Sequence, residues 1–455
     1  MQLLTYKSYS FFHFIMFPLF NWVLPLFSIK AKERLLFEKK NFDSIESKSF
    51  HTSSLKANTC YEVSSEGELE QLRPLIISDL ERSRLVEIVF CSDSVEAQCL
   101  SLFKKYPNQL RIFRLPILSF KSWGKNKHCL WEWVTAESLF LCRYDFFPEL
   151  MILGRQRMKF FALISASLKG KDLSQMGVIE NKVYNYIYKS FDFFTTPTSR
   201  DKSLLQIHFN LPQDKIQVVD LRVLQIMDRL KTAQETMTYK IPGQEFLLPF
   251  LEDNIAKTMV FGSFWPIEVD LMNEDFFQSI KKSELTPVIV PHRLSSEDIG
   301  RIKLNLKAAC GDLCIYQINQ DDSPSEVENV INALNEKNGI LLFNVKGILC
   351  EFYSMFKLAY VGGGHGRSVH SLLEPYLANC NLLCGPKTFR STEYDIIIER
   401  SVEHIKNIHE ANDLLPSISE MLSKSVDISK RGQYISDTVI VGHEVSQLLE
   451  IKNDR

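Results

Sequence analysis

The feature that most constrains the fold is an alternation of short apolar runs with longer mixed stretches, which recurs in two series along the chain. Each run is long enough for a buried strand, and each intervening stretch is long enough for a turn and a helix. The runs are 87–91, 111–114, 139–143, 160–165, 192–195 and 216–220, and then 259–262, 287–290, 313–317, 340–343, 358–361 and 381–383. This rhythm is typical of βαβ units and predicts two consecutive parallel α/β domains.

The stretch between the two series, 227–257, is polar at first and then apolar, and we interpret it as a linker. Two closing helices are expected at 402–425 and 440–451. The predicted division is a membrane anchor at 1–30, a connector at 31–58, a first lobe at 59–226, the linker at 227–257, a second lobe at 258–430 and a C-terminal helix or tail at 431–455. Ligands of such sheets bind at the carboxyl ends of the strands, so we expect the site between two facing lobes.

Composition narrows the class of protein. The hydrophobic fraction of 45% and charged fraction of 24% are those of a globular chain, which excludes a disordered, collagen-like or multi-spanning membrane protein. A formal net charge of −2 argues against a protein that binds nucleic acid through broad basic surface. The 10 cysteines form no Cys-x-x-Cys pair, so we expect reduced thiols and no metal site.

The N-terminal segment is expected to contact a membrane. Residues 8–29 contain no Lys, Arg, Asp or Glu, and that length is enough to cross a hydrocarbon core of about 30 Å. The basic residues Lys30, Lys32, Arg34, Lys39 and Lys40 follow at once. By the positive-inside rule this flank and the main body stay in the cytoplasm, and a cleaved signal peptide is the weaker interpretation. Pro18 and Pro25 weaken a spanning helix, so spanning and lying in the interface both remain open.

The first candidate site segment is the turn Ser65-Glu66-Gly67-Glu68, which precedes a helical pattern. A helix start has free backbone N–H groups and favours an acidic residue. Glu68 is a candidate general base if it faces the cleft. The alternative is that Glu66, Glu68 and Glu70 form a solvated first turn that complements the helix dipole.

The second candidate segment is a glycine block at 362–366, which follows an apolar strand and precedes a helical pattern. Glycines allow close backbone approach, and a helix start binds phosphate or carboxylate, so this block is a candidate phosphate site to which Arg367 adds charge. His370 and Glu374 are four residues apart and are expected on one helix face, where Glu374 suits the hydroxyls of a ribose. A tight structural turn is the alternative.

Three weaker segments also follow second-series strands. They are the Gly262-Ser263 turn, Pro291-His292-Arg293, and Gly385-Pro386. Arg293 or His292 suits a phosphate or carboxylate. Each segment alone is more often a plain turn, but their shared place at strand ends supports a common site.

Taken in order, these segments resemble the 3-deoxy-D-manno-octulosonic acid (Kdo) transferases of lipopolysaccharide synthesis. The residues that carry the resemblance are the N-terminal anchor, Ser65-Glu66-Gly67-Glu68, Asp145-Phe146-Phe147-Pro148, Gly262-Ser263, Pro291-His292-Arg293, the block from Gly362 to Glu374, and Gly385-Pro386. The resemblance covers roughly residues 1 to 425, and the glycine block is its strongest part.

The resemblance implies an α/β fold of two facing Rossmann-like lobes, of the glycosyltransferase-B type, with an N-terminal membrane-anchoring helix. The implied enzyme is a metal-independent, inverting glycosyltransferase without a cofactor, which moves Kdo from CMP-Kdo to a lipid A precursor. Its place is the cytoplasmic side of the bacterial inner membrane, and nucleic acid is not a partner.

The resemblance also implies roles for individual residues. Glu68 inherits the catalytic base. The implied donor-binding residues are Ser263, Pro291, His292, Arg293, Gly363, Gly364, Gly366, Arg367, His370, Glu374, Gly385 and Pro386. The implied acceptor-side or interlobe residues are Ser65, Gly67, Asp145 and Arg222.

The chain departs from the family pattern mainly in the first lobe. Arg143 stands where the family has a carboxylate, and Arg222 stands near the place of a lysine. Two alternatives therefore remain: a related transferase with a modified lipid acceptor, and a non-catalytic relative that binds a lipid A precursor or a CMP-sugar.

Overall fold

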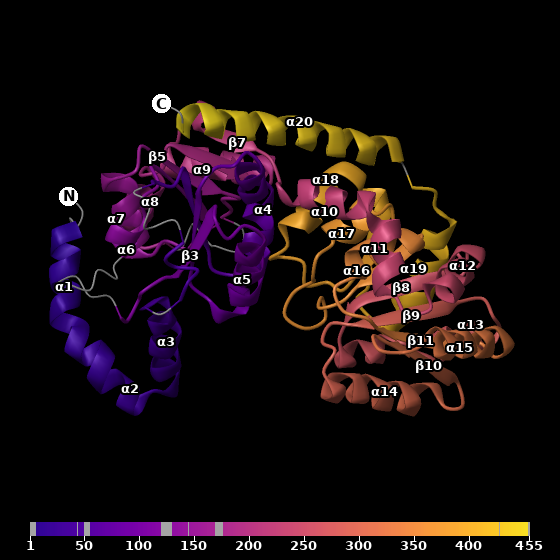
Figure 1. Ribbon diagram of the computed structural model, residues 1–455. Coiled ribbons are helices and arrows are strands. Elements are labelled where there is room, and N and C mark those ends of the chain that lie inside the picture. The colour runs from indigo at the N-terminus through magenta and orange to yellow at the C-terminus, as the bar shows by residue number, and fades with distance from the viewer. Residues whose placement is uncertain are drawn as a thin grey trace. The chain divides into compact units, whose positions relative to one another are not determined.

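The computed structural model describes residues 6–42, 44–49, 55–119, 130–143, 145–168, 176–426 and 428–453. Contacts divide the chain into two compact units, Met1–Gln225 with Thr438–Arg455, and Ile226–Asp437. Each unit is a Rossmann-like lobe built on one parallel seven-stranded sheet (Figure 1). The two series of apolar runs thus correspond to two sheets, as predicted.

The first sheet has the strand order β3-β2-β1-β4-β5-β6-β7. Its strands are β1 (Thr59–Val63), β2 (Val86–Phe90), β3 (Leu110–Arg114), β4 (Ser138–Cys142), β5 (Phe160–Ile164), β6 (Phe193–Thr196) and β7 (Ile216–Val218). The order reverses between β1 and β4, and this switch point is where open α/β sheets bind ligands. The predicted runs include all of these strands except β1, whose sequence contains the buried Glu62.

Helices cover both faces of the first sheet. They are α4 (Glu66–Glu81), α5 (Glu96–Lys105), α6 (Leu130–Trp133), α7 (Pro148–Gln156), α8 (Val178–Tyr188) and α9 (Ser199–Phe209). One apolar cluster includes Leu72 of α4 and Leu102 of α5, and another includes Leu150 of α7 and Leu205 of α9. Because apolar side chains fill both faces, the strands lie in the centre of the core.

The second sheet has the strand order β10-β11-β9-β8-β12-β13-β14. Its strands are β8 (Thr258–Phe264), β9 (Thr286–Pro291), β10 (Cys314–Asn319), β11 (Gly339–Asn344), β12 (Leu358–Val361), β13 (Asn381–Cys384) and β14 (Ile405–Asn407). The predicted helix at 402–425 is wrong over its first part. There a 3-10 turn and β14 precede α19 (Ala411–Ser423), because Ile405–Asn407 pairs with β13 in parallel.

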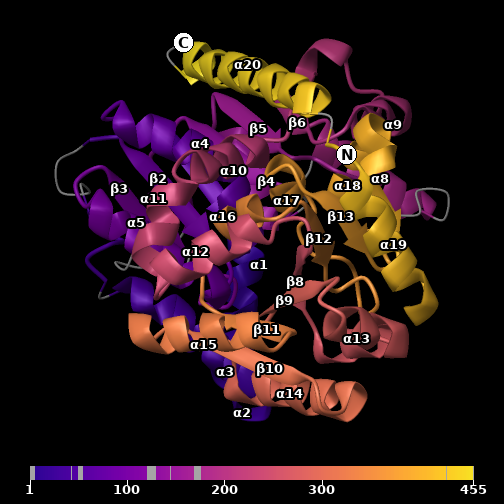
Figure 2. The ribbon, with the colours of Figure 1, turned by 90° about the vertical axis from the view of Figure 1, so that its right-hand side faces the viewer.

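Helix α10 (Arg222–Lys231) begins in the first unit, where Leu224 packs against an apolar cluster, and ends in the second unit. The other helices of the second unit are α11 (Ala233–Lys240), α12 (Gln244–Asp253), α13 (Glu274–Lys281), α14 (Ser296–Cys310), α15 (Pro324–Glu336), α16 (Leu349–Phe352), α17 (Leu373–Leu377), α18 (Thr392–Ser401) and α19. Helix α15 contacts β10, and α19 contacts β13 (Figure 2). The stretch 227–257 is largely helical, and Arg229 of α10 forms an ion pair with Glu351 of α16 at 2.7 Å. The helix predicted at 440–451 is part of α20 (Ile428–Asn453).

The N-terminal segment is helical from α1 (Tyr6–Pro18) through a π-helical turn (Leu19–Val23), α2 (Leu24–Phe27) and α3 (Ile29–Lys39) (Figure 1). By length and composition alone, Lys7–Phe27 is long and apolar enough to cross a membrane. The chain turns at α2, and α3 leads back to the first unit (Figure 1).

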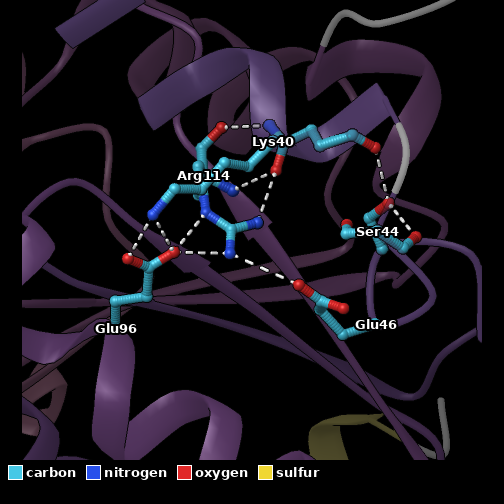
Figure 3. A network of polar contacts seen from close by, with 7 residues as sticks. Lys40, Ser44, Glu46, Glu96 and Arg114 are labelled. Carbon is cyan, nitrogen blue, oxygen red and sulfur yellow. Dashed lines mark hydrogen bonds and ion pairs between the residues drawn. The ribbon is translucent and has the colours of Figure 1, made fainter. Parts of the chain in front are cut away.

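A polar network centred on the buried Arg114 holds the segment after α3 against the first sheet (Figure 3). The guanidinium of Arg114 on β3 donates to Glu96 at 2.6 Å and to Glu46 at 3.3 Å. Asn41 accepts the backbone N–H of Arg114 and donates to its carbonyl oxygen, at 2.9 and 2.8 Å. Lys40 completes the network through an ion pair with Glu96 at 2.8 Å.

Candidate functional site

Three carboxylates gather at the switch point of the first sheet. Glu62 lies in β1, Glu68 lies in the first turn of α4, and Asp145 follows β4, which is the neighbour of β1. Burial is the largest cause that raises the pKa of both glutamates, and the negative charge of Asp145 acts in the same direction. Sequence analysis predicted Glu68 and Asp145 here, and the fold adds Glu62.

Glu68 is held by the turn that begins α4. Ser65 is the N-cap, and its hydroxyl accepts the backbone N–H of Glu68 at 3.4 Å. The Glu68 carboxylate accepts the backbone N–H of Ser64 at 2.7 Å. The side chain of Glu68 is buried, whereas Glu66 in the same turn is exposed. A solvated, dipole-complementing carboxylate therefore describes Glu66 but not Glu68.

The environment of Glu68 brings the pKa of its carboxyl group close to neutral pH. Burial is the largest cause and raises its pKa to about 7, while the hydrogen bond from Ser64 and the positive charge of Arg143 act in the opposite direction. A general base works best when its pKa lies near the working pH. The site therefore has a carboxylate suited to accept a proton at neutral pH.

Glu62 is the residue of this cluster that sequence analysis missed. It is fully buried, and its Oε1 accepts the hydroxyl of Ser64 at 2.6 Å. Burial, followed by the charges of Glu68 and Asp145, raises its pKa well above the ordinary value. Ser64 thus lies between the two glutamates, with its hydroxyl on one and its N–H on the other. The available signal was a glutamate within Cys60–Val63, whose other residues are apolar or aromatic.

The other first-lobe residues singled out in the sequence are Arg143, Arg222 and Gly67. Arg143 follows β4 with a backbone φ of 62°. Arg222 forms an ion pair with Asp220 at 2.5 Å, two residues away at the start of α10. Gly67 is exposed, and a Cβ there would meet no atom within 4 Å, so packing does not require glycine at this position.

In the second unit, the glycine block forms a compact turn after β12. Gly363 has a φ of 94°, in the left-handed region that favours glycine. A Cβ at Gly362 would collide with the carbonyl oxygen of Ser263, and a Cβ at Gly364 would lie 2.7 Å from Gly385. The block therefore brings together backbone from the ends of β8, β12 and β13. Four residues predicted for the donor site, Ser263, Gly363, Gly364 and Gly385, meet here.

A buried glutamate that sequence analysis missed fixes this turn. Glu268 follows β8, and its carboxylate accepts the N–H of Gly363 at 2.8 Å and the Tyr360 hydroxyl at 3.0 Å. Its other oxygen accepts the N–H of Trp265 at 2.9 Å. Burial is the largest influence on its pKa, which is raised. Glu268 thus joins the ends of β8 and β12 across the switch point of the second sheet.

Beside this turn lies a stack of three aromatic rings. The rings of His292 and His370 are 4.0 Å apart, and Trp265 stacks on His292 at 4.6 Å. The indole Nε1 of Trp265 donates to Nε2 of His370 at 2.8 Å, and Arg293 lies over the Trp265 ring at 5.3 Å. Burial lowers the pKa of His370 to about 4, so both ring contacts involve a neutral imidazole at pH 7.

The predicted helix face shared by His370 and Glu374 is wrong. Helix α17 begins only at Leu373, so Glu374 lies in its first turn and His370 precedes it in an irregular segment. The carboxylate of Glu393 accepts the N–H groups of Leu372 and Leu373, at 2.6 and 2.9 Å. The N–H groups at this helix start, where the sequence predicted a bound phosphate, therefore donate to the side chain of Glu393. Arg367 is exposed in the preceding turn.

A cavity of about 470 Å³ opens at the carboxyl ends of β8, β9 and β11. Its lining includes the predicted residues Ser263, Pro291 and His292, together with Lys346. Lys346 follows β11 and was missed, because one lysine after a strand carries no sequence signal of a site. The cavity thus combines aromatic and cationic groups, which suits a ligand with a ring and a negative charge. Within the described ranges, no group of three or more His, Cys, Asp and Glu stands close enough to hold a metal ion.

Comparison with known proteins supports the fold. No protein-family model matches the chain, and no curated protein matches its sequence. Among solved structures, UDP-GlcNAc 2-epimerase from Neisseria meningitidis, bound to UDP-GlcNAc, has a TM-score of 0.52 and 14% identity over 84% of this chain and 99% of that chain. Another UDP-N-acetylglucosamine 2-epimerase has a TM-score of 0.50 and 12% identity over 84% and 90%.

A third similar structure is the C-terminal CMP-Kdo binding domain of WaaA from Acinetobacter baumannii. It covers 49% of this chain and 99% of that domain, with 16% identity and a TM-score of 0.31. The chain has the two-lobed, glycosyltransferase-B-like α/β fold, and its predicted fold class is confirmed.

Proposed function

We propose that the chain is an inverting glycosyltransferase that transfers Kdo from CMP-Kdo to a lipid A precursor at the cytoplasmic face of a bacterial inner membrane. The observation that carries this proposal is Glu68, a buried carboxylate at the switch point of the first sheet with a pKa of about 7. Its place in a Ser-x-Gly-Glu turn links it to the Kdo transferases, which the sequence resembles.

In the proposed step, an acceptor hydroxyl oxygen attacks the anomeric carbon of Kdo on the face opposite the phosphate. The new glycosidic bond forms as the bond from that carbon to the phosphate oxygen breaks, and CMP departs with the electron pair. The hydroxyl proton passes to the Glu68 carboxylate. The products are the glycosylated lipid with inverted configuration, CMP and a protonated Glu68 that returns its proton to water.

We assign the donor to the second unit, at the cavity beside the glycine turn. Lys346 lines this cavity, and Ser263 and His292 add polar groups. Stacked neutral imidazole and indole rings offer a flat surface for a pyrimidine base. CMP-Kdo carries one phosphate and one carboxylate, which a cationic side chain such as Lys346 suits.

The test is transfer of Kdo from CMP-Kdo, generated in situ, to a tetra-acylated lipid A precursor by the purified full chain, with mass spectrometry of the lipid. We expect a mass increase of one or more Kdo units. Glu68→Gln should abolish the increase while CMP binding by calorimetry is retained, and Glu66→Gln, in the same turn but exposed, should leave both unchanged.

The alternatives give different results. Binding of CMP without any lipid product would favour a modified lipid acceptor or a non-catalytic binding protein, and a panel of lipid acceptors separates those two. Full activity of Glu68→Gln would remove Glu68 from the mechanism. Absence of both CMP binding and product would refute the proposal.

A further inference from the structure

The segment from α1 to α3 has two unlike sides within the first unit. One side is apolar and solvent-exposed, and we call it the N-terminal apolar surface. It consists of Phe11, Phe12, Phe14, Ile15, Leu19, Trp22, Val23, Leu24, Leu26, Phe27 and Ile29. Aromatic side chains bury about 150–250 Å² each when covered, so the aromatic members of this surface alone present roughly 600 Å². Monomeric soluble proteins rarely expose an apolar patch that large.

The other side of the same segment is attached to the first unit. Ser10 and His13 are buried, and α1 contacts α7. Further along, the side-chain amide of Asn21 donates to the carbonyl oxygen of Leu118 at 2.8 Å. Contacts at Ser10, His13 and Asn21 thus follow one side of the segment, at the three- to four-residue spacing of a helix or a multiple of it.

Helix α3 fixes the end of the segment to the carboxyl edge of the first sheet. Its Glu38 carboxylate is buried and accepts the N–H groups of Ile117, Leu118 and Ser119, the last at 2.6 Å. Its Arg34 donates to the carbonyl oxygens of Cys91 and Leu115, which follow β2 and β3. The first part of the predicted connector, 31–58, is therefore helical and bound to the first unit.

The charges next to the apolar surface favour a lipid partner. Lys30 and Lys32 are exposed on α3 directly after Ile29, beside the exposed Glu33, and Lys39 is exposed at the end of the helix. Apolar and aromatic side chains followed by lysines match the acyl chains and anionic headgroups at one face of a bilayer. Binding of a second protein would not require an apolar surface this continuous with lysines at its end.

We infer that the N-terminal segment lies in the membrane interface and does not span the bilayer. A spanning helix of 21 residues would have to leave the first unit, because otherwise α7, which contacts α1, and the backbone of Leu118, which accepts from Asn21, would enter hydrocarbon with it. The apolar surface enters one leaflet instead, and both ends of the chain stay on the same side of the membrane. If the proposed function holds, α3 also keeps the edge that carries Glu68 next to the lipid.

The topology is tested with the full chain carrying different N- and C-terminal tags, in sealed membrane vesicles whose cytoplasmic face points outward. Protease added outside should remove both tags. Removal of the C-terminal tag with protection of the N-terminal tag until detergent is added would show a spanning helix and overturn the inference. Recovery of the protein outside the membrane fraction would overturn it as well.

Lipid binding is tested by flotation of the purified chain with phosphatidylcholine vesicles that contain phosphatidylglycerol. Phe11→Glu with Ile15→Glu should lower the floated fraction at least tenfold, and Leu304→Glu, at an equally exposed apolar residue of the second unit, should not. Lys30→Glu with Lys32→Glu should lower binding only when phosphatidylglycerol is present. Equal flotation of the Phe11 and Ile15 variant would overturn the inference. These results do not depend on Kdo transfer, so the inference and the proposed function fail separately.

Discussion

Replacing Glu68 by glutamine should abolish proton transfer and, at alkaline pH, stabilise the first unit. The pKa of Glu68 is raised from 4.5 to about 7, mainly by burial. A raised pKa of a carboxyl means that the folded state disfavours the ionised form. The protonated carboxyl therefore contributes stability that is fully present below the unfolded pKa of 4.5 and is lost as pH rises through about 7.

The magnitude follows from the size of the shift. Each pKa unit corresponds to 1.36 kcal/mol, so ionised Glu68 costs the folded state about 3 kcal/mol at pH 8 and below about 1 kcal/mol at pH 5. Glutamine keeps an oxygen that accepts the N–H of Ser64 and removes the charge. Because 1 kcal/mol shifts the melting temperature of a domain of this size by about 2–4 °C, the upper limit at pH 8 is about 6–12 °C.

The assay is thermal unfolding of the wild-type chain and the Glu68→Gln variant at pH 5 and pH 8, with kcat for Kdo transfer measured on the same preparations. The gain in melting temperature of the variant over the wild type should be larger at pH 8 than at pH 5. The kcat of the variant should be at least a hundredfold below that of the wild type. Glu66→Gln is the matched control, since its carboxylate is exposed. A difference in melting temperature that is the same at both pH values would refute the buried-charge reasoning, whatever the activity shows.

Three further outcomes are expected. Gly363→Ala should weaken CMP binding, measured by calorimetry, at least about tenfold, because φ at this residue is 94° and the new Cβ would lie 2.8 Å from the His370 ring. The control Gly300→Ala should bind CMP normally. Unchanged CMP affinity of Gly363→Ala would contradict the assigned donor site. Arg111→Ala should lower the free energy of unfolding in urea by about 3–5 kcal/mol, because it leaves the Glu87 carboxylate buried without its ion-pair partner, and a loss below 1 kcal/mol would refute this. The wild-type chain should lose thermal stability as pH falls from 6.5 towards 4, because the pKa of His370 is lowered to about 4 in the folded state and the unfolded state therefore binds a proton more readily. His370→Phe should lose less stability over the same pH range. An equal loss in both proteins would exclude His370 as its source.

Local patterns in the sequence were sufficient for most of the architecture. Apolar runs such as 160–165 and 340–343 predicted buried parallel strands, because strands covered on both faces are apolar throughout. Ser65 predicted the start of α4, since its hydroxyl is the local acceptor that a helix N-terminus needs. The two-lobed fold class follows from these elements and is confirmed.

Elements that depend on distant partners were missed. Strand β1 contains the buried Glu62, and it is a strand because β2 and β4 pair with it in parallel on its two sides. Strand β14 is three residues long and is a strand only because β13 pairs with it. The irregular backbone at His370 is set by its N–H bond to the Gly362 carbonyl and by the ring stack. In each case the deciding contact joins segments that no local window contains.

The candidate site divides along the same line. The sequence by itself determined the chemistry offered at the strand ends: Glu68 in a capped turn, and glycines, histidines and an arginine after second-series strands. Only the tertiary structure decided which of these groups meet, and it added Glu62, Glu268 and Lys346. The physical reason is that burial and neighbouring charge, which raise the pKa of Glu68 to about 7, are properties of the packed fold and not of the residue.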